Sequence, residues 1–209
     1  MIGGGFSSLE EIKEARPDFL KEEFIRDKCQ KRPGDKLYDE TTLWIPSEVW
    51  KTFTPAMKQY WEIKQDNYEK ILFFKLGKFY EIFYNDAIIC QRILDLNWMG
   101  GAKKLHVGFP EKALDKYLSI LVKHGYKVAV VEQTETPKMM EKRIKNTKGH
   151  ADKCVERKVT EIVTKGTFTD RRDEESSGYE PKYILTYRKF QKTIGVTFFD
   201  VTTLKIFIG

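Results

Sequence analysis

The sequence predicts a small α/β domain with a mixed sheet, followed by the beginning of a second, β-rich domain. Two patterns predict it. Strand-like and helix-like segments alternate over about 90 residues in the middle of the chain, which is typical of mixed α/β folds. Three strand-like segments with little helix between them then end the chain. Of the 209 residues, 41% are hydrophobic and 13% aromatic, enough to build a packed core.

We expect four parts. An extended N-terminal arm covers residues 1–52, the α/β domain covers 53–168, a linker covers 169–182, and the incomplete β-rich domain covers 183–209.

The arm is punctuated by turn-forming residues. A short helix over Leu9–Ala15 is stopped by Pro17, and Arg32-Pro33-Gly34-Asp35 has the composition of a turn. Large apolar side chains in Leu43-Trp44-Ile45-Pro46 and Val49-Trp50 would be costly to leave in water. We therefore expect the arm to lie on a neighbouring surface and not to be a free linker.

The α/β domain begins with a helix and a buried strand. Thr54-Pro55 suits the first turn of a helix over 56–69, where apolar residues recur at helical spacing. The continuous apolar run 71–76 is short and aromatic, which favours a buried strand, and Gly77 breaks it. A further helix is expected to start at Asn85 or Asp86, both good N-caps, and to run to Leu94.

A second strand–helix–strand unit follows, and its last strand leads into a basic helix. The expected elements are a strand and glycine turn over 98–104, a helix that opens at Gly108-Phe109-Pro110-Glu111 and ends at Gly125, a strand over 126–132, and a basic helix over 138–145 begun by Pro137.

The composition of the chain changes after about residue 170. A charged, polar segment over 170–178 reads as a linker or exposed loop. Strands are then expected over 183–187, 193–200 and 203–208. Three strands without a covering helix leave one face of a sheet bare, so we expect this domain to be cut short.

Several classes of protein and of site are disfavoured. No apolar run reaches the roughly 18 residues that a membrane span needs, and residues 1–6 do not resemble a secretory signal. Three cysteines, far apart, fit a reducing compartment better than a disulfide framework or a zinc site. The three histidines are scattered, and neither a nucleophile elbow nor a phosphate-binding loop is present. We expect no enzyme active site, metal or cofactor within this chain.

The basic charge is concentrated in one segment. Residues 138–158 contain eight basic and three acidic residues, in a chain with a formal net charge of +6. A basic segment beside a folded domain suits a polyanion, for which nucleic acid is the leading candidate. A solvated charged helix or loop is the alternative.

Gly77-Lys78-Phe79-Tyr80-Glu81 is the segment that suggests a binding site. If the chain is extended there, Phe79 and Glu81 point to the same side. The ring could then stack on a nucleic-acid base and the carboxylate could hydrogen-bond to it. The alternative places Phe79 in the core and Glu81 on the surface.

These residues resemble the MutS mismatch-repair family. Gly77-Lys78-Phe79-Tyr80-Glu81, followed by Phe83 and Asp86-Ala87, is similar to its Phe-x-Glu element. Further similar motifs are Gly108-Phe109-Pro110-Glu111, Val131-Glu132-Gln133-Thr134-Glu135 and Thr164-Lys165-Gly166-Thr167. The segments 35–46 and 54–64, together with Lys78, resemble the eukaryotic subgroup called the sixth MutS homologue.

The resemblance implies a mechanism of DNA recognition. In this family the phenylalanine is inserted from the minor groove beside a mispaired base and the glutamate hydrogen-bonds to that base. These roles fall on Phe79 and Glu81, and Lys78, Lys103 and Lys104 would contact the DNA backbone. Unstacking is least costly where pairing is already poor, so a wedge of this kind discriminates by deformability.

The resemblance also implies what lies outside these residues. The family's ATPase domain has no counterpart here, so ATP and Mg²⁺ are expected only in that missing domain, and residues 183–209 resemble only the start of an RNase H-like connector. The chain would be a fragment of a longer protein or a truncated paralogue. The expected partners are mismatched double-stranded DNA and a MutS-type partner subunit, the second MutS homologue, in a nuclear heterodimer without a membrane. A MutS-like scaffold and a generic nucleic-acid-binding module remain the alternatives.

Overall fold

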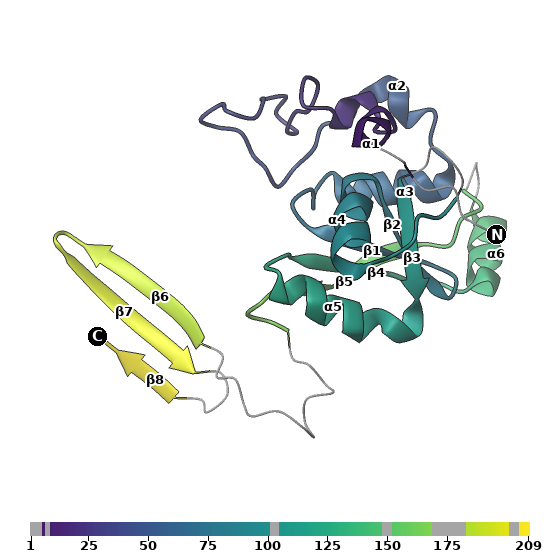
Figure 1. The fold of residues 1–209 in the computed structure, drawn as a ribbon. Helices are drawn as coiled ribbons and strands as arrows, with labels where there is room; N and C mark the ends of the chain where they lie inside the picture. The colour runs from purple at the N-terminus through teal and green to yellow at the C-terminus, as the bar shows by residue number, and fades with distance from the viewer. Residues whose placement is uncertain (1–5, 7–8, 101–104, 148–151, 169–182, 201–204) are drawn as a thin grey trace.

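A five-stranded mixed sheet forms the centre of the first domain (Figure 1). The computed structural model describes residues 6, 9–100, 105–147, 152–168, 183–200 and 205–209. The strand order is β3-β2-β1-β4-β5, with β1 parallel to β4 and every other neighbouring pair antiparallel. The strands are β1 (Ile71–Leu76), β2 (Phe79–Phe83), β3 (His106–Pro110), β4 (Val128–Gln133) and β5 (Arg157–Val163).

Helices and short helical turns surround this sheet. They are α1 (Leu9–Glu14), η1 (Asp18–Leu20), α2 (Ser47–Trp50), α3 (Pro55–Lys64), α4 (Tyr84–Leu94), η2 (Glu111–Ala113), α5 (Leu114–Lys123) and α6 (Pro137–Asn146).

Both faces of the sheet are buried, by different parts of the chain. Ile71 and Phe73 of β1 belong to one apolar cluster with the inner faces of α4 and α5. Leu72 and Phe74 point the other way and belong to a second cluster with α3 and the arm. This explains why β1 reads as an unbroken apolar run, since a strand covered on both sides has no polar face.

The arm covers the second face. Leu43 is fully buried and Ile45 nearly so, and both belong to the cluster that contains Leu72 and Phe74. The Leu43 N–H also donates a 2.9 Å hydrogen bond to the Gln65 carbonyl just beyond α3. The arm therefore lies on the sheet and α3, and its apolar residues contribute to the core.

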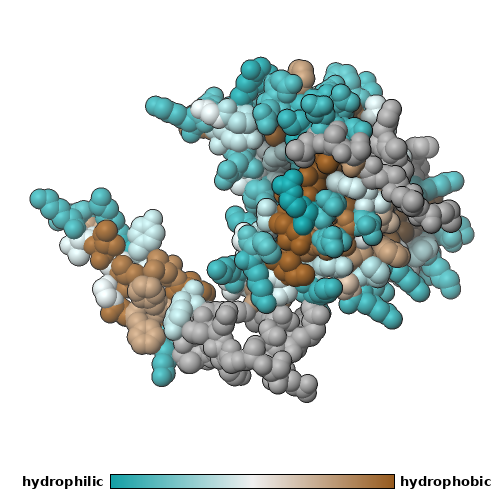
Figure 2. Space-filling model, viewed as in Figure 1, coloured by the Kyte–Doolittle hydropathy of each residue, from teal (hydrophilic) through white to brown (hydrophobic). Residues whose placement is uncertain are grey.

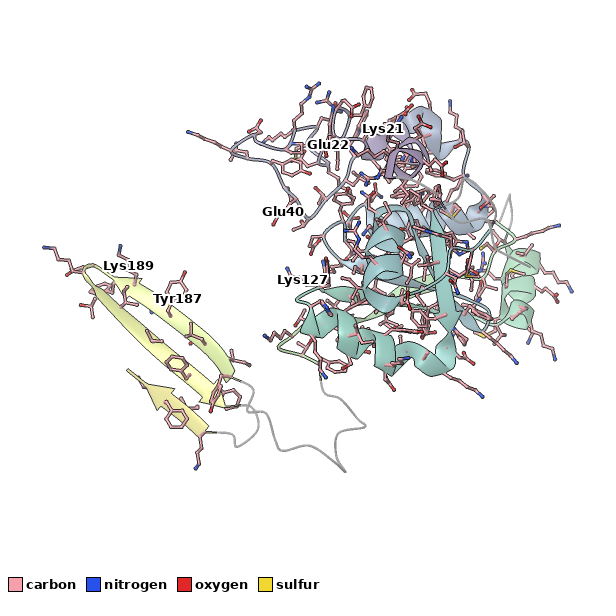
Figure 3. The ribbon with its side chains drawn as sticks, viewed as in Figure 1. Lys21, Glu22, Glu40, Lys127, Tyr187 and Lys189 are labelled. Atoms are coloured by element: carbon pink, nitrogen blue, oxygen red, sulfur yellow. The ribbon has the colours of Figure 1, made fainter. Side chains whose placement is uncertain are left out.

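The three strands near the end of the chain form a separate antiparallel sheet. It consists of β6 (Tyr183–Phe190), β7 (Thr193–Asp200) and β8 (Lys205–Ile208). Hydrophobic residues dominate its visible surface (Figure 2), and Tyr187 and Lys189 project from β6 (Figure 3). No described helix packs on it, and Ile208 is 84% exposed. The mixed sheet followed by this short β-sheet confirms the predicted fold class.

The prediction of a strand over 98–104 was wrong for residues 98–100, the part of it that the structure describes. Residues 98–100 are not a strand and 101–104 lie outside the described residues. The strand is β3, which begins at His106 and pairs with β2 up to the Phe79–Pro110 pair. Val107 and Phe109 alternate into the core along it. Pro110 therefore ends a strand, a position that suits a residue without an N–H, and α5 begins only at Leu114.

Three further elements differ from the sequence-based expectation. The strand β5 was not predicted, because most of its side chains are exposed and polar, as on many edge strands. The helix α3 ends at Lys64 instead of residue 69. The helix α4 starts at Tyr84, and Asp86 is not its N-cap, since its carboxylate is buried against Lys64.

In the described part of the chain, no helix combines the length and the apolar character that crossing a membrane would require.

Candidate functional site

The β1–β2 hairpin presents an exposed phenylalanine at its tip. Gly77 and Lys78 form a two-residue turn between the paired residues Leu76 and Phe79. Gly77 has φ +63°, the left-handed value that the first central residue of a type II′ turn requires and that glycine adopts without strain. Phe79 follows at once and is 42% exposed, so it does not belong to the core.

Tyr80, between the two candidate residues, fixes the hairpin from the opposite face. Its ring packs against Phe73 and Phe109, and its hydroxyl donates a hydrogen bond to the Glu132 carboxylate. The Lys75 ammonium lies 4.4 Å from the centre of the ring. Burial and the neighbouring carboxylate raise the pKa of Tyr80 well above its usual range, so the hydroxyl stays protonated and keeps donating. This anchoring holds Phe79 and Glu81 on the other face.

Glu81 lies on the same face as Phe79, as the strand alternation predicted. Its side chain is only 21% exposed. It lies opposite Gly108 of β3, and its Oε2 is 2.9 Å from Nε2 of His106. The carboxylate is therefore partly sheltered beside His106 and Gly108 of β3, on the same face of β2 as the exposed ring of Phe79.

The other carboxylates near the tip have basic or hydroxyl partners. Glu111 forms a 2.6 Å ion pair with Lys75, and this hydrogen bond and charge lower the pKa of Glu111. The Glu111 N–H also donates to the carbonyl of Lys78 at 2.9 Å. Lys78 itself is exposed. The tip of the hairpin thus presents the exposed ring of Phe79 and the exposed ammonium group of Lys78, while the charge of Glu111 is neutralised within the protein.

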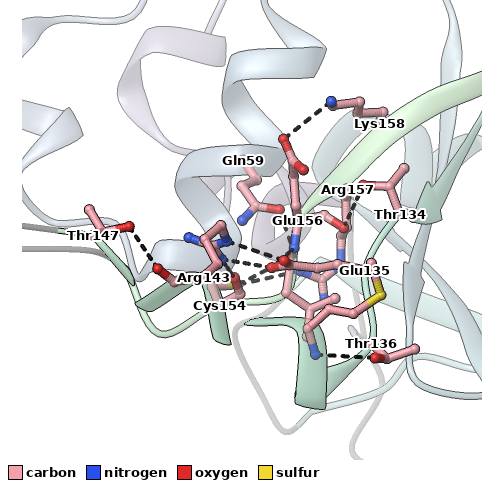
Figure 4. Close-up of polar contacts among 12 residues, drawn as sticks. Gln59, Thr134, Glu135, Thr136, Arg143, Thr147, Cys154, Glu156, Arg157 and Lys158 are labelled. Carbon is pink, nitrogen blue, oxygen red and sulfur yellow. Dashed lines mark hydrogen bonds and ion pairs between the residues drawn. The ribbon is translucent and has the colours of Figure 1, made fainter. Parts of the chain in front are cut away.

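The basic helix α6 lies near the carboxyl ends of the central strands and is held by polar contacts to neighbouring segments (Figure 4). It follows β4, whose carboxyl end lies beside that of the parallel strand β1. Arg143 makes a two-pronged ion pair with Glu135 and also donates to the Cys154 carbonyl, and the hydrogen bond from Arg143 lowers the pKa of Glu135. Arg143 therefore serves the fold. The exposed lysines of α6 are Lys138, Lys142 and Lys145.

The structure brings three of the five predicted site residues together. Phe79, Glu81 and Lys78 lie at one end of the β1–β2 hairpin. Lys103 and Lys104 lie outside the described residues. Among the described residues, no cluster of three or more histidine, cysteine or acidic side chains could hold a metal ion.

Sequence reasoning missed His106 and Gly108, which face Glu81 across the strands. The histidines were considered only as metal ligands, and the strand expected over 98–104 hid the pairing of β3 with β2. The signal that could have found them is the alternation of apolar residues over His106-Val107-Gly108-Phe109, which is typical of a half-buried strand.

Comparison with known proteins yields one matching family and many relatives. Residues 54–172 match the family described as MutS domain I. The chain is 42% identical over 192 residues to the DNA mismatch repair protein MSH6 of Arabidopsis thaliana and 38% identical over 203 residues to Msh6 of Homo sapiens. These matches cover 88% and 92% of this chain, but 14% and 15% of the relatives.

A bacterial relative matches more weakly. The chain is 37% identical over 162 residues to the DNA mismatch repair protein MutS of Rickettsia typhi, covering 74% of this chain and 17% of that protein. The chain therefore spans about a sixth of the length of the relatives that it matches.

Proposed function

This chain belongs to the MutS family and is similar to the N-terminal region of its MSH6 members, as its motifs predicted, and we propose that it recognises mispaired or small-loop DNA in mismatch repair. In this proposal Phe79 enters the duplex from the minor groove beside the mispaired base, and Glu81 hydrogen-bonds to that base. Lys78 contacts the adjacent phosphates.

The observation that carries the proposal is the exposed Phe79 beside a sheltered carboxylate. An aromatic ring that is 42% exposed at the tip of a rigid hairpin is available to stack on a base. Inserting such a ring costs a few kcal/mol of unstacking, and the cost is lowest where the bases already pair poorly. A carboxylate near phosphates repels a normal duplex unless a base compensates it, so Glu81 would add discrimination against paired DNA.

The partner, the location and the chemistry of the whole protein belong to the same proposal. The MSH6 relatives are eukaryotic mismatch repair proteins. We infer a nuclear protein that works as a heterodimer with the second MutS homologue and whose ATP and Mg²⁺ bind in a domain outside these residues. Within this chain we propose binding without catalysis.

Two other functions are separable by experiment. A MutS-like scaffold needs neither Phe79 nor Glu81, and a generic nucleic-acid-binding module has no use for a carboxylate at the contact. Both DNA-binding functions predict an affinity that falls steeply with salt, but only mismatch recognition predicts that a G·T duplex outcompetes paired duplex at fixed salt.

The test is competition between a G·T duplex and its paired control at low salt, for the wild type, Phe79→Ala and Glu81→Ala. The measurement is made on this chain and on a full-length MSH6-type heterodimer in which this chain replaces the corresponding region. Aromatic stacking contributes about 1–3 kcal/mol per base, so Phe79→Ala should reduce the preference for G·T by about 10-fold or more.

Phe24→Ala serves as the matched control, because Phe24 is 53% exposed on the arm and should leave the preference unchanged. Equal binding of both duplexes by the wild-type heterodimer, unaffected by Phe79→Ala, would refute mismatch recognition by this site.

A further inference from the structure

We propose that His106 is a positioning residue for Glu81, holding the carboxylate beside β3 so that it is oriented before a base arrives. The inference rests on the proposed function of Glu81 and extends it to a residue on a different strand.

The contact itself is the first argument. Nε2 of His106 lies 2.9 Å from Oε2 of Glu81, with both side chains largely buried, at 14% and 21% exposure. Nε2 is buried and has no well-aligned hydrogen bond to any described residue. In the free protein the two side chains are therefore in close polar contact without an aligned hydrogen bond.

The imidazole is held by neighbours other than Glu81, so it can position the carboxylate. The His106 ring stacks on Phe83 with centroids 4.7 Å apart and planes 16° apart. Phe83 in turn packs against the fully buried ring of Tyr60. The backbone of His106 is held as well, by its pairing with Phe83 and by a 2.8 Å hydrogen bond from the Met99 N–H. The glutamate has several rotatable bonds and is ordered by what it touches.

The absence of a side chain at Gly108 leaves room next to Glu81 and Met99. Gly108 lies opposite Glu81, and a Cβ at Gly108 would come within 3.6 Å of Cγ of Glu81 and 3.1 Å of Sδ of Met99. A larger residue at Gly108 would crowd Met99 and the Tyr80 carbonyl next to Glu81, so the glycine lets β3, with His106, lie close to β2. Orienting a carboxylate in advance reduces the conformational entropy lost when it binds a base.

The first test uses the free protein and needs no DNA. Long-range ¹H–¹⁵N spectra of the imidazole at about pH 8, where an ordinary histidine is neutral, report which ring nitrogen carries the proton. An acceptor at 2.9 Å should favour the tautomer protonated at Nε2, and Glu81→Ala should reduce that preference. Identical spectra for His106 in both proteins would overturn the contact.

The second test measures the preference for a G·T over a paired duplex in the heterodimer described above. His106→Phe keeps a ring to stack on Phe83 but has no donor, whereas His106→Gln keeps a donor without the ring. We expect His106→Phe to lower the preference by roughly 10-fold, the loss expected when a close polar contact with a charged group is removed, and His106→Gln to retain most of it. In a Glu81→Ala background, His106→Phe should change nothing further.

The outcomes separate the inference from the proposed function. If Phe79→Ala and Glu81→Ala abolish the preference but His106→Phe leaves it intact, the inference fails and the function stands. If His106→Phe has the same effect with and without Glu81, the histidine acts independently and the inference fails as well. If neither Phe79→Ala nor Glu81→Ala matters, the function fails and the inference fails with it.

Discussion

At the scale of single residues, the site depends on Gly108. A glycine is required there because a side chain would be crowded, and not because the backbone angle demands it. Gly108 does not have a positive φ. A Cβ there would meet the Tyr80 carbonyl oxygen at 3.0 Å and the Met99 sulfur at 3.1 Å. The sulfur is at the end of a flexible side chain and can move, but the carbonyl belongs to the neighbouring strand, so β3 would have to shift.

Gly108→Ala should therefore be destabilising and should also weaken discrimination. Overpacking of this kind costs about 1–3 kcal/mol, and a shift of β3 would move His106 relative to Glu81. Chemical denaturation measures the first effect and the competition between G·T and paired duplexes the second. Gly166→Ala is the control, since its Cβ would meet only Oγ1 of Thr164 at 4.0 Å. Equal stabilities of the two variants would contradict the crowding inferred at Gly108.

The residue scale also shows where sequence reasoning stops. The alternation of a strand was enough to place Phe79 and Glu81 on one side, because it is a property of neighbouring residues along one strand. The contact of Glu81 with His106 joins residues of different strands and depends on the register of β2 against β3. No local sequence pattern encodes that register, so the contact between Glu81 and His106 became visible only in the structure.

At the scale of elements, one buried ion pair joins α3, β1 and α4. The Lys64 ammonium is 2.8 Å from Asp86 and also donates to the carbonyls of Tyr68 and Lys70 at 3.0 and 2.6 Å. Asp86 accepts a further hydrogen bond from the Leu72 N–H. Burial raises the pKa of Asp86, and the charge of Lys64 opposes this. The pair satisfies two loop carbonyls and a strand N–H, so it ties the three elements together.

Lys64→Met should destabilise the chain by about 3–5 kcal/mol, because it leaves a buried carboxylate without its cation. The double variant Lys64→Met/Asp86→Leu should recover much of this loss, since it removes both charges. Thermal and urea unfolding measure both changes. Lys28→Met is the control, because Lys28 pairs with Asp66 at an exposed site and its loss should cost at most about 1 kcal/mol. A loss as small as that for Lys64→Met would refute the structural role of the pair.

The elements differ in how far their sequences reveal them. The strand β1 and the helices α5 and α6 were predicted, because apolar runs, an apolar helical face and Pro137 are local signals. The edge strands β3 and β5 were not. Polar side chains conceal β5, and Pro110 suggested the start of a helix where it ends β3.

At the scale of the whole molecule, the arm completes the first domain. Without it, the face of the sheet that carries Leu72 and Phe74 would lose Leu43 and Ile45 from its apolar cluster. The edge-on contact of Phe19 with Trp61, with ring centroids 5.1 Å apart, would be lost as well. The sequence suggested only that the arm lies on some surface. The surface is the second face of the sheet, the face to which Phe79 and Glu81 of β2 also point.

Leu43→Ala is the most direct test of this dependence. Leu43 is fully buried, and truncating a buried leucine costs about 2–5 kcal/mol, a large fraction of the stability of a small domain. Leu37→Ala, at a position 71% exposed on the same arm, should change the unfolding free energy by less than about 0.5 kcal/mol. A chain that begins at residue 53 should go further, exposing Leu72 and Phe74, binding hydrophobic dyes and unfolding at a lower temperature. If that shortened chain instead unfolds at the same temperature as the whole chain, the domain is stable without the arm, and the packing of the arm against the sheet contributes nothing to its stability.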